Sequence, residues 1–201
     1  MNISPHEIAF DIDGVFADTF RHFLERARQL FGLSLDYEEA TEYEFWTKVQ
    51  LTQDQIQELI HGIIREPLGI GIRPIAGAVD VLSRLAEYGP LFFVTARKDN
   101  DSIGHWIRNQ LPGVEGDSIR IIATGASQEK IPVLQENRVR YFVEDRLDTC
   151  FLLKETAITP IVFDQPWNRK PHPFQVVNGW KELAELIIWE DGSTGVRLDF
   201  P

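Results

Sequence analysis

The 201-residue sequence contains a single cysteine, Cys150, and no long apolar run. One cysteine cannot form a disulfide within the chain, which favours a reducing compartment such as the cytoplasm. The first residues lack the basic and then apolar pattern of a signal peptide, and no apolar run has the length of a membrane span. We therefore expect a cytoplasmic protein without a membrane partner.

Positive charge is also scarce. Acidic residues outnumber basic ones by 31 to 20, which gives a formal net charge of −11. Proteins that bind nucleic-acid polymers need clustered Lys and Arg to neutralise phosphates, so this balance argues against a polynucleotide partner. It leaves room for a small phosphate ester in a locally basic pocket. The length and the 43% of hydrophobic residues suit one domain with a sizeable core, with room for an inserted subdomain.

The most informative stretch is residues 8–15, a short apolar run that leads to Asp11, Asp13 and Gly14. Such a run is typical of a buried parallel strand, and ligands bind beyond the carboxyl ends of such strands. Two carboxylates this close repel each other unless a cation or a proton lies between them. Mg²⁺ suits these oxygen ligands and leaves positions for phosphate oxygens. A strand followed by an ordinary Asp-Gly turn is the alternative.

The apolar spacing predicts helices and strands along the whole chain. Three helices without an intervening strand are predicted over residues 18–32, 36–50 and 52–66. After residue 75 the predicted helices are 76–88, 99–110, 130–137, 147–154 and 178–190, and the predicted strands are 91–95, 119–123, 141–143 and 160–163. Residues 164–174 are predicted to be irregular, and the last ten residues to form a loose tail.

This order predicts an α/β fold with a doubly wound, Rossmann-like parallel sheet. Residues 1–17 and 74–201 would form the α/β core. Residues 18–73 would form a small helical cap, because an insertion of that length after the first strand exceeds an ordinary crossover.

Polar residues recur at the ends of three later strands. The hydroxyl of Thr95 and nearby backbone N–H groups can hold phosphate oxygens where a helix begins. Lys130, at a predicted helix start, supplies a positive charge for the same oxygens. Glu144 and Asp145 can complete an oxygen-ligand set around Mg²⁺. Each has an ordinary alternative (a helix cap, a solvated lysine, a turn), but four such strand ends in chain order favour a phosphate site.

These four strand ends resemble the motifs of the haloacid dehalogenase-like (HAD) hydrolase superfamily. The resemblance implies that Asp11 is the nucleophile that forms an aspartyl-phosphate and that Asp13 is the acid/base residue. It implies that Thr95 and Lys130 hold the phosphoryl group, and that the cofactor is Mg²⁺. The implied metal ligands are Asp11, Asp13 through its carbonyl, Asp145, and Glu144 in an assisting role.

Within the superfamily the chain is similar to the cytosolic and mitochondrial 5′(3′)-deoxyribonucleotidases and their bacterial relatives. Residues 11–18, 74–79 and 163–169 carry this similarity. It implies a Mg²⁺-dependent phosphatase of a small phosphate monoester, with a (deoxy)nucleoside monophosphate as the leading substrate. A phosphatase of another small metabolite, a mutase, and a catalytically idle relative that binds a phosphorylated ligand remain alternatives.

Candidate substrate contacts are Ala96, Arg97, Phe45 and Trp46. The two aromatic rings either stack on a nucleobase or pack the cap onto the core. Arg97 either holds phosphate or pairs with a surface acid. The departure from the animal nucleotidases is at Thr95-Ala96-Arg97, where those enzymes carry a different small-residue pair. A small phosphorylated molecule is the expected partner, and a homodimer is left open.

Overall fold

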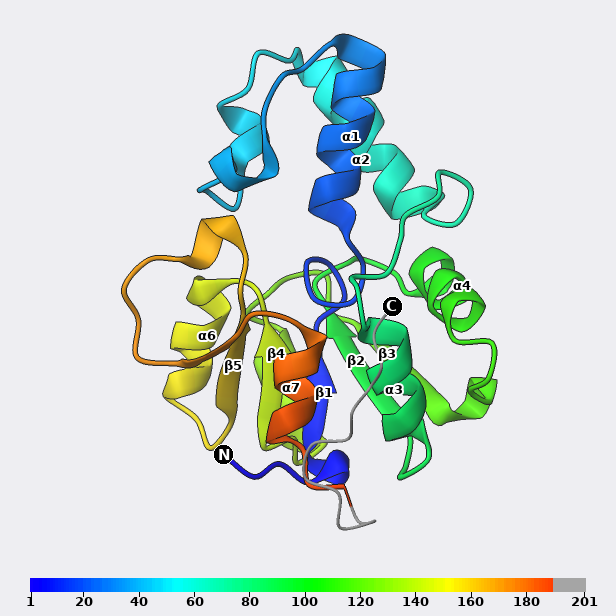
Figure 1. Ribbon diagram of the computed structural model, residues 1–201, viewed down its shortest axis with the longest axis vertical. Helices are drawn as coiled ribbons and strands as arrows, with labels where there is room; N and C mark the ends of the chain where they lie inside the picture. Colours follow the sequence, from blue (N-terminus) through cyan, green and yellow to red (C-terminus); the bar gives the residue numbers. More distant parts are fainter. Residues whose placement is uncertain (190–201) are drawn as a thin grey trace.

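A six-stranded sheet lies at the centre of the computed structural model, which describes residues 1–189 (Figure 1). The strand order is β3-β2-β1-β4-β5-β6, and each strand runs parallel to its neighbours. This confirms the predicted doubly wound parallel sheet. The strands are β1 (Ile8–Phe10), β2 (Leu91–Thr95), β3 (Ile119–Ala123), β4 (Tyr141–Glu144), β5 (Thr159–Phe163) and β6 (Gln175–Val177).

Helices cover both faces of the sheet. Successive strand residues point to opposite faces, so Phe10 belongs to one hydrophobic cluster and its neighbour Ala9 to another. The faces that these two residues mark are covered by different helices. The first is packed against α3 (Ala78–Ala86), α4 (Asp101–Gln110) and α7 (Trp180–Leu186), and the second against α5 (Lys130–Glu136) and α6 (Leu147–Lys154).

Residues 18–73, called the cap segment below, lie at the edge of the sheet where the strands end (Figure 1). Its two helices, α1 (Thr19–Phe31) and α2 (Gln53–Arg65), pack against each other. Both helices lie within the predicted ranges 18–32 and 52–66. Gly32 ends α1 with a left-handed φ of 70°, and Thr52 begins α2 with a capping box. The cap segment therefore stands over the strand ends that carry the predicted site. The division into core and cap domains stays a prediction.

The helix predicted over residues 36–50 is wrong. Two single-turn 3₁₀ helices, η2 (Tyr37–Glu39) and η3 (Phe45–Thr47), take its place. The rings of Tyr37 and Tyr43 both make edge-to-face contacts with Trp167, which comes from far along the chain. These tertiary contacts, rather than a helical apolar stripe, set the path of the segment. The other short 3₁₀ helices are η1 (Pro5–Glu7), η4 (Gly116–Ser118) and η5 (Pro166–Asn168).

The end of the described chain also differs from prediction. Strand β6, which was not predicted, pairs with β5 through three residues. Helix α7 is shorter than the predicted 178–190, because Ile187 forms a β-bridge with Ile3 and Ile188 N–H donates to Ile3 O. The predicted loose tail lies outside the described residues.

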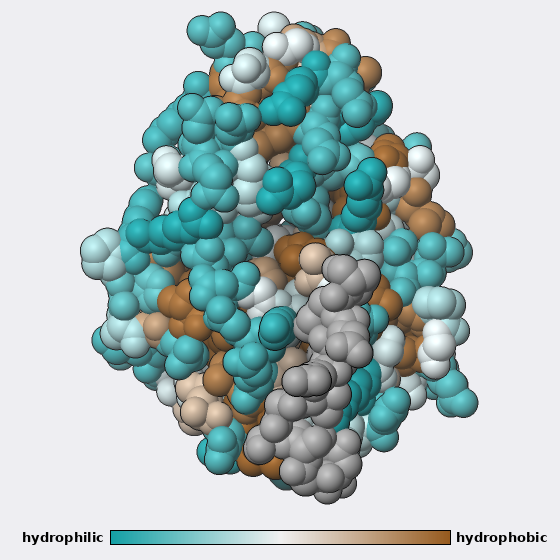
Figure 2. All heavy atoms as spheres, viewed as in Figure 1, coloured by the Kyte–Doolittle hydropathy of each residue, from teal (hydrophilic) through white to brown (hydrophobic). Residues whose placement is uncertain are grey.

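The helices and the surface of the described part of the chain bear on membrane contact. None of its helices is long and apolar enough to cross a membrane. Hydrophilic residues cover most of the face in Figure 2, where hydrophobic residues show as separate patches.

Candidate active site

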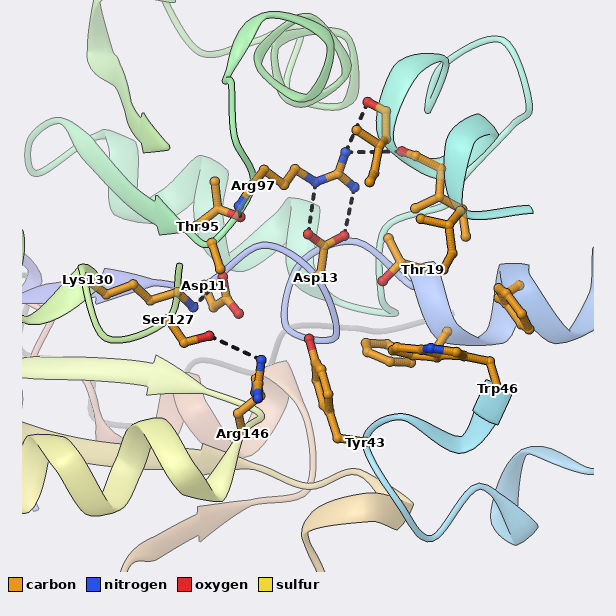
Figure 3. A pocket seen from close by; sticks show the side chains of 16 residues that line it. Asp11, Asp13, Thr19, Tyr43, Trp46, Thr95, Arg97, Ser127, Lys130 and Arg146 are labelled. Carbon is orange, nitrogen blue, oxygen red and sulfur yellow. Dashed lines mark hydrogen bonds and ion pairs between the residues drawn. The ribbon is translucent and has the colours of Figure 1, made fainter. Parts of the chain in front are cut away.

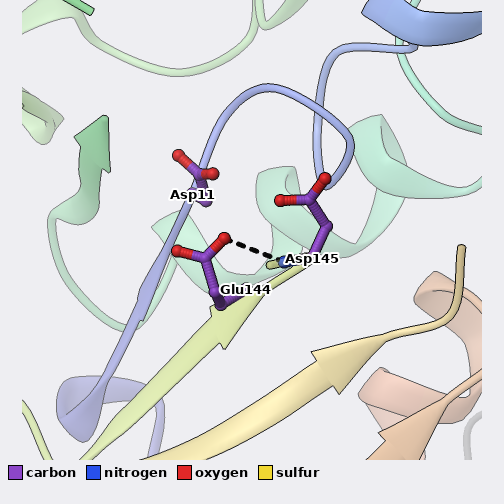
Figure 4. A group of neighbouring side chains, drawn as sticks. All are labelled: Asp11, Glu144 and Asp145. Atoms are coloured by element: carbon purple, nitrogen blue, oxygen red, sulfur yellow. Dashed lines mark hydrogen bonds between the residues drawn. The ribbon is translucent and has the colours of Figure 1, made fainter. Parts of the chain in front are cut away.

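The ends of β1 and β2 bring Asp11 and Thr95 together (Figure 3), and Asp145, at the end of β4, lies beside Asp11 (Figure 4). This is the edge at which open α/β sheets bind ligands, beside the point where the strand order reverses. The loop after β1 turns at Gly14, whose φ is 78°. A Cβ at Gly14 would lie 2.4 Å from Asp145 Oδ2, so the close approach of this loop to Asp145 requires glycine.

Lys130 lies buried between two carboxylates. Its Nζ donates to Glu144 Oε2 at 2.8 Å and lies 3.0 Å from Asp11 Oδ1. Burial alone would lower the pKa of Lys130, but the carboxylates of Asp11 and Glu144 outweigh it and raise this pKa above its usual value. Lys130 is therefore a fixed cation beside Asp11, where a phosphoryl oxygen would need one.

Asp11, Glu144 and Asp145 form a buried acidic cluster, in which one oxygen of each residue lies within 4.8 Å of the others (Figure 4). Glu144 is fully engaged, because its Oε1 accepts hydrogen bonds from the backbone N–H groups of Asp145 and Arg146, and its Oε2 accepts from Lys130. Asp145 Oδ1, by contrast, is buried and has no hydrogen-bond partner among residues 1–189. Burying an unpartnered carboxylate oxygen is costly, and a bound cation removes that cost. The all-oxygen donor set fits a hard divalent cation.

The cluster also perturbs Asp11. Burial raises the pKa of Asp11 to about 7, with a smaller contribution from the nearby Glu144 and Asp13, although the charge of Lys130 acts in the opposite direction. In the folded chain, without a bound metal ion, the ionised form of Asp11 is therefore destabilised relative to the protonated form, even with Lys130 beside it. A divalent cation would favour the ionised form, which is the form that can act as a nucleophile.

We expect Asp11→Asn to stabilise the metal-free protein, and to do so more as the pH rises. Below the usual pKa of 3.8 the group is protonated in both states and contributes nothing. Between that value and about 7 the unfolded state ionises first, so stability falls with pH, and above about 7 the full penalty remains. Thermal unfolding of both proteins in EDTA from about pH 4 to about pH 8 measures the effect. A difference in Tm between Asp11→Asn and the wild type that does not change with pH would contradict this prediction.

Asp13 is paired with Arg97. The Nε and Nη2 atoms of Arg97 donate to the two oxygens of Asp13 at 2.9 and 2.8 Å, and its Nη1 donates to Ile63 O at 3.0 Å. Burial acts to raise the pKa of Asp13, but the guanidinium outweighs it and lowers this pKa below its usual value. Arg97 was expected to hold phosphate or to pair with a surface acid; the structure shows it paired with an acid that is not on the surface. That acid lies in the site, and Arg97 also holds the end of α2.

A cavity of about 250 Å³ separates this cluster from the cap segment (Figure 3). Its floor is polar and its opposite wall is apolar. Trp46 lines the cavity, whereas Phe45 is buried inside the cap segment with its ring edge-to-face against Phe23. The polar lining residues are Asp11, Asp13, Thr19, Thr95, Arg97, Ser127, Lys130 and Arg146, and the others are Phe20, Phe23, Tyr43, Trp46, Ile60, Ile63, Ile64 and Ala96.

Residues 5–191 match the family described as 5′ nucleotidase, deoxy (Pyrimidine), cytosolic type C protein. The chain belongs to this family. A protein named as a nucleotidase from Clostridium acetobutylicum is 22% identical over 182 residues, which cover 90% of this chain and 92% of that protein.

Solved structures with the same fold are HAD hydrolases. A protein described as the HAD hydrolase YfnB from Bacillus subtilis aligns with a TM-score of 0.57 and 16% identity over 89% of this chain and 96% of its own. A haloacid dehalogenase-like hydrolase from Streptococcus pneumoniae aligns with a TM-score of 0.54 and 18% identity over 88% of this chain and 96% of its own. The expected superfamily and its nucleotidase branch are confirmed, and the chain is a hydrolase of the phosphomonoesterase type.

The sequence did not single out some residues of this nucleotidase-family site. Arg146 donates from Nη1 to Ser127 Oγ at 3.1 Å, and its guanidinium lies 4.1 Å from the ring centroid of Tyr43. Its place directly after Asp145 at a strand end was an available signal. Trp167 donates to Asp145 Oδ2 at 3.1 Å, but it follows β5 and has no spacing relation to the motifs.

Proposed function

We propose that the chain is a Mg²⁺-dependent phosphatase that hydrolyses (deoxy)nucleoside monophosphates through an aspartyl-phosphate on Asp11. One observation carries the proposal. At one end of an aromatic-walled cavity, Asp11 lies 3.0 Å from the ammonium of Lys130 and in a cluster with Asp145, whose Oδ1 has no hydrogen-bond partner in the described part of the chain. Nucleophile, fixed cation and open ligand oxygen are the parts that phosphoryl transfer needs.

The residues divide the reaction into two steps. An oxygen of Asp11 attacks phosphorus, and the bond from phosphorus to the ester oxygen breaks while Asp13 gives a proton to the leaving alcohol. Because the pair with Arg97 lowers the pKa of Asp13, this step requires that pair to open when the ester binds, so that Asp13 is protonated. Water then attacks phosphorus of the aspartyl-phosphate while Asp13 accepts a proton from the water. The bond from phosphorus to the Asp11 oxygen breaks, which restores the Asp11 carboxylate and releases inorganic phosphate. The pair with Arg97 stabilises the ionised Asp13 that this second step requires.

The surrounding groups stabilise charge on phosphorus. Lys130 neutralises part of the charge on the transferred group, and Thr95, at the end of β2, places a hydroxyl beside it. Mg²⁺ would be held by Asp11, Asp145 and the carbonyl of Asp13, with Glu144 orienting the site, and would supply positive charge to phosphoryl oxygens. The magnesium-bound form of the similar hydrolase from Bacillus subtilis supports the choice of cation.

The apolar wall supports a nucleotide substrate. Tyr43, Trp46 and the isoleucines of α2 face the polar floor across the cavity, and flat nucleobases stack on aromatic rings. The nucleotidase name of the clostridial relative supports the same class. A phosphatase of another small metabolite would use the same floor without needing the ring of Trp46.

Trp46→Ala should lower kcat/KM for deoxynucleoside monophosphates by roughly tenfold or more, because a stacking contact is worth about 1–3 kcal/mol. The loss for p-nitrophenyl phosphate should be much smaller. Steady-state kinetics over a panel of phosphate esters that includes all nucleoside monophosphates measures both effects. Phe45→Leu is the matched control, because the ring of Phe45 packs inside the cap segment. This substitution should change kcat/KM by the same factor for every substrate. Equal losses in Trp46→Ala on every ester would mean that the ring only packs the cap segment. No loss on nucleotides in a folded variant would reject the nucleotide substrate and leave the phosphatase.

A further inference from the structure

Trp167 connects the acidic cluster to the hydrophobic interior of the cap segment. It lies in η5, in the loop after β5, and is 4% exposed. Its ring centroid is 4.2 Å from that of Phe20 on α1. Among the described residues, the other members of the hydrophobic cluster around it lie between residues 20 and 63. A core residue thus completes the interior of the cap segment.

The polar edge of the same indole contacts Asp145. Its Nε1 donates to Asp145 Oδ2 at 3.1 Å, and the loop at Gly14 passes so close that an added Cβ there would lie 2.4 Å from the same oxygen. With Oδ2 held in this way, Oδ1 is the oxygen left without a partner. Figure 4 shows one carboxylate oxygen of Asp145 pointing toward Asp11. The indole therefore fixes the rotation of the carboxylate about its last bond.

Neighbouring residues keep the loop itself in place. Asn168 Nδ2 donates to the backbone oxygens of Asp145 and Phe163, and Gln165 Nε2 donates to Gly14 O at 2.7 Å. Exposed ion pairs also join this loop to the cap segment, among them Lys170 with Glu42. Ion pairs of that kind contribute little. Gln165 also joins the loop to the cap segment, since its Oε1 accepts a hydrogen bond from the hydroxyl of Tyr37. The buried indole differs from these links because it contacts the side chain of Asp145 and α1 through one rigid group.

We propose that Trp167 is a positioning residue that holds Asp145 for a divalent cation and links cation binding to the packing of α1. This inference rests on the metal site of the proposed function. Groups that hydrogen-bond to metal-ligating carboxylates orient them, and removing such a group commonly costs about 10–100-fold in metal affinity. Because the ring also packs on Phe20, a cation that fixes Asp145 fixes the indole and through it the first turns of α1.

The test is Mg²⁺ affinity, measured by isothermal titration calorimetry on the full chain without substrate. Trp167→Phe keeps an aromatic ring but removes the N–H, and it should weaken Mg²⁺ binding by about tenfold or more. Trp189→Phe is the matched control. Trp189 is also buried, and it donates its N–H to the backbone oxygen of Ala184. Its ring packs on Tyr88, which precedes the first residue of β2 and so lies at the end of that strand opposite Thr95. Its substitution should leave Mg²⁺ affinity unchanged.

If Trp167→Phe does not fold, benzothienylalanine at position 167 keeps the bicyclic shape without the N–H and serves the same test. Hydrogen exchange gives a second readout, since Mg²⁺ should slow amide exchange in α1 of the wild type and not of the variant. Unchanged Mg²⁺ affinity in the variant overturns the positioning role, and equal protection of α1 overturns the link. A wild type that binds no Mg²⁺ is a different result, because it rejects the metal site of the proposed function and with it this inference.

Discussion

Asp11→Asn should lower phosphatase activity by at least about four orders of magnitude, because removal of a covalent nucleophile from an otherwise intact site has effects of that size. The amide has the shape of the carboxylate but cannot form the aspartyl-phosphate. Lys130 keeps its 2.8 Å hydrogen bond to Glu144, so the buried ammonium retains an anionic partner and the fold should persist. Loss of activity in a folded protein separates chemistry from stability.

Initial rates on p-nitrophenyl phosphate with saturating Mg²⁺ measure this loss, with circular dichroism as the check on folding. Asp164→Asn is the control, since Asp164 pairs with the half-exposed Arg169 on the surface, and it should keep near wild-type rates. Activity of Asp11→Asn within about tenfold of the wild type would mean that water attacks phosphorus directly. A wild type without activity on any phosphate ester would favour the idle, ligand-binding alternative.

The predictable part of the fold is the part that depends on short stretches of sequence. Apolar runs before Asp11 and Thr95 form β1 and β2, and alternation of such runs with helices predicts the parallel sheet. The helix predicted over residues 36–50 was wrong, because Tyr37 and Tyr43 pack on Trp167. The spacing of apolar residues within the segment gives no sign of that distant contact. Strand β6 was not predicted, because its three residues are too few to show a strand pattern in the sequence.

The candidate site divides in the same way. Asp11, Lys130 and Asp145 could be brought together from sequence, because the carboxyl ends of neighbouring parallel strands meet at one edge. The choice between phosphate and an acid for Arg97 needed coordinates, since its partner Asp13 lies on another strand end. The hydrogen bond from Trp167 to Asp145 could not be foreseen, because it depends on how one loop folds back.

Chelation of divalent cations should abolish turnover, and Mg²⁺ should restore it fully while Ca²⁺ restores little. Three buried carboxylates face one another beside the ammonium of Lys130, and Asp145 Oδ1 has no hydrogen-bond partner among the residues that the structure describes. The pKa of Asp11 is raised to about 7. Without a cation, Asp11 is therefore partly protonated and poorly nucleophilic at neutral pH. Ca²⁺ carries the same charge, but its longer bonds and looser coordination would misplace the nucleophile.

Two measurements on the same samples decide the point. Rates in EDTA, and after addition of Mg²⁺ or Ca²⁺, give the catalytic effect, and thermal unfolding gives binding without substrate. A cation at about 100 times its Kd should stabilise the folded state by about 2.7 kcal/mol. Ca²⁺ should therefore raise Tm while failing to restore the rate, which distinguishes filling the site from aligning Asp11. Full activity in EDTA would remove the cation from the reaction and leave Lys130 as the cation beside Asp11.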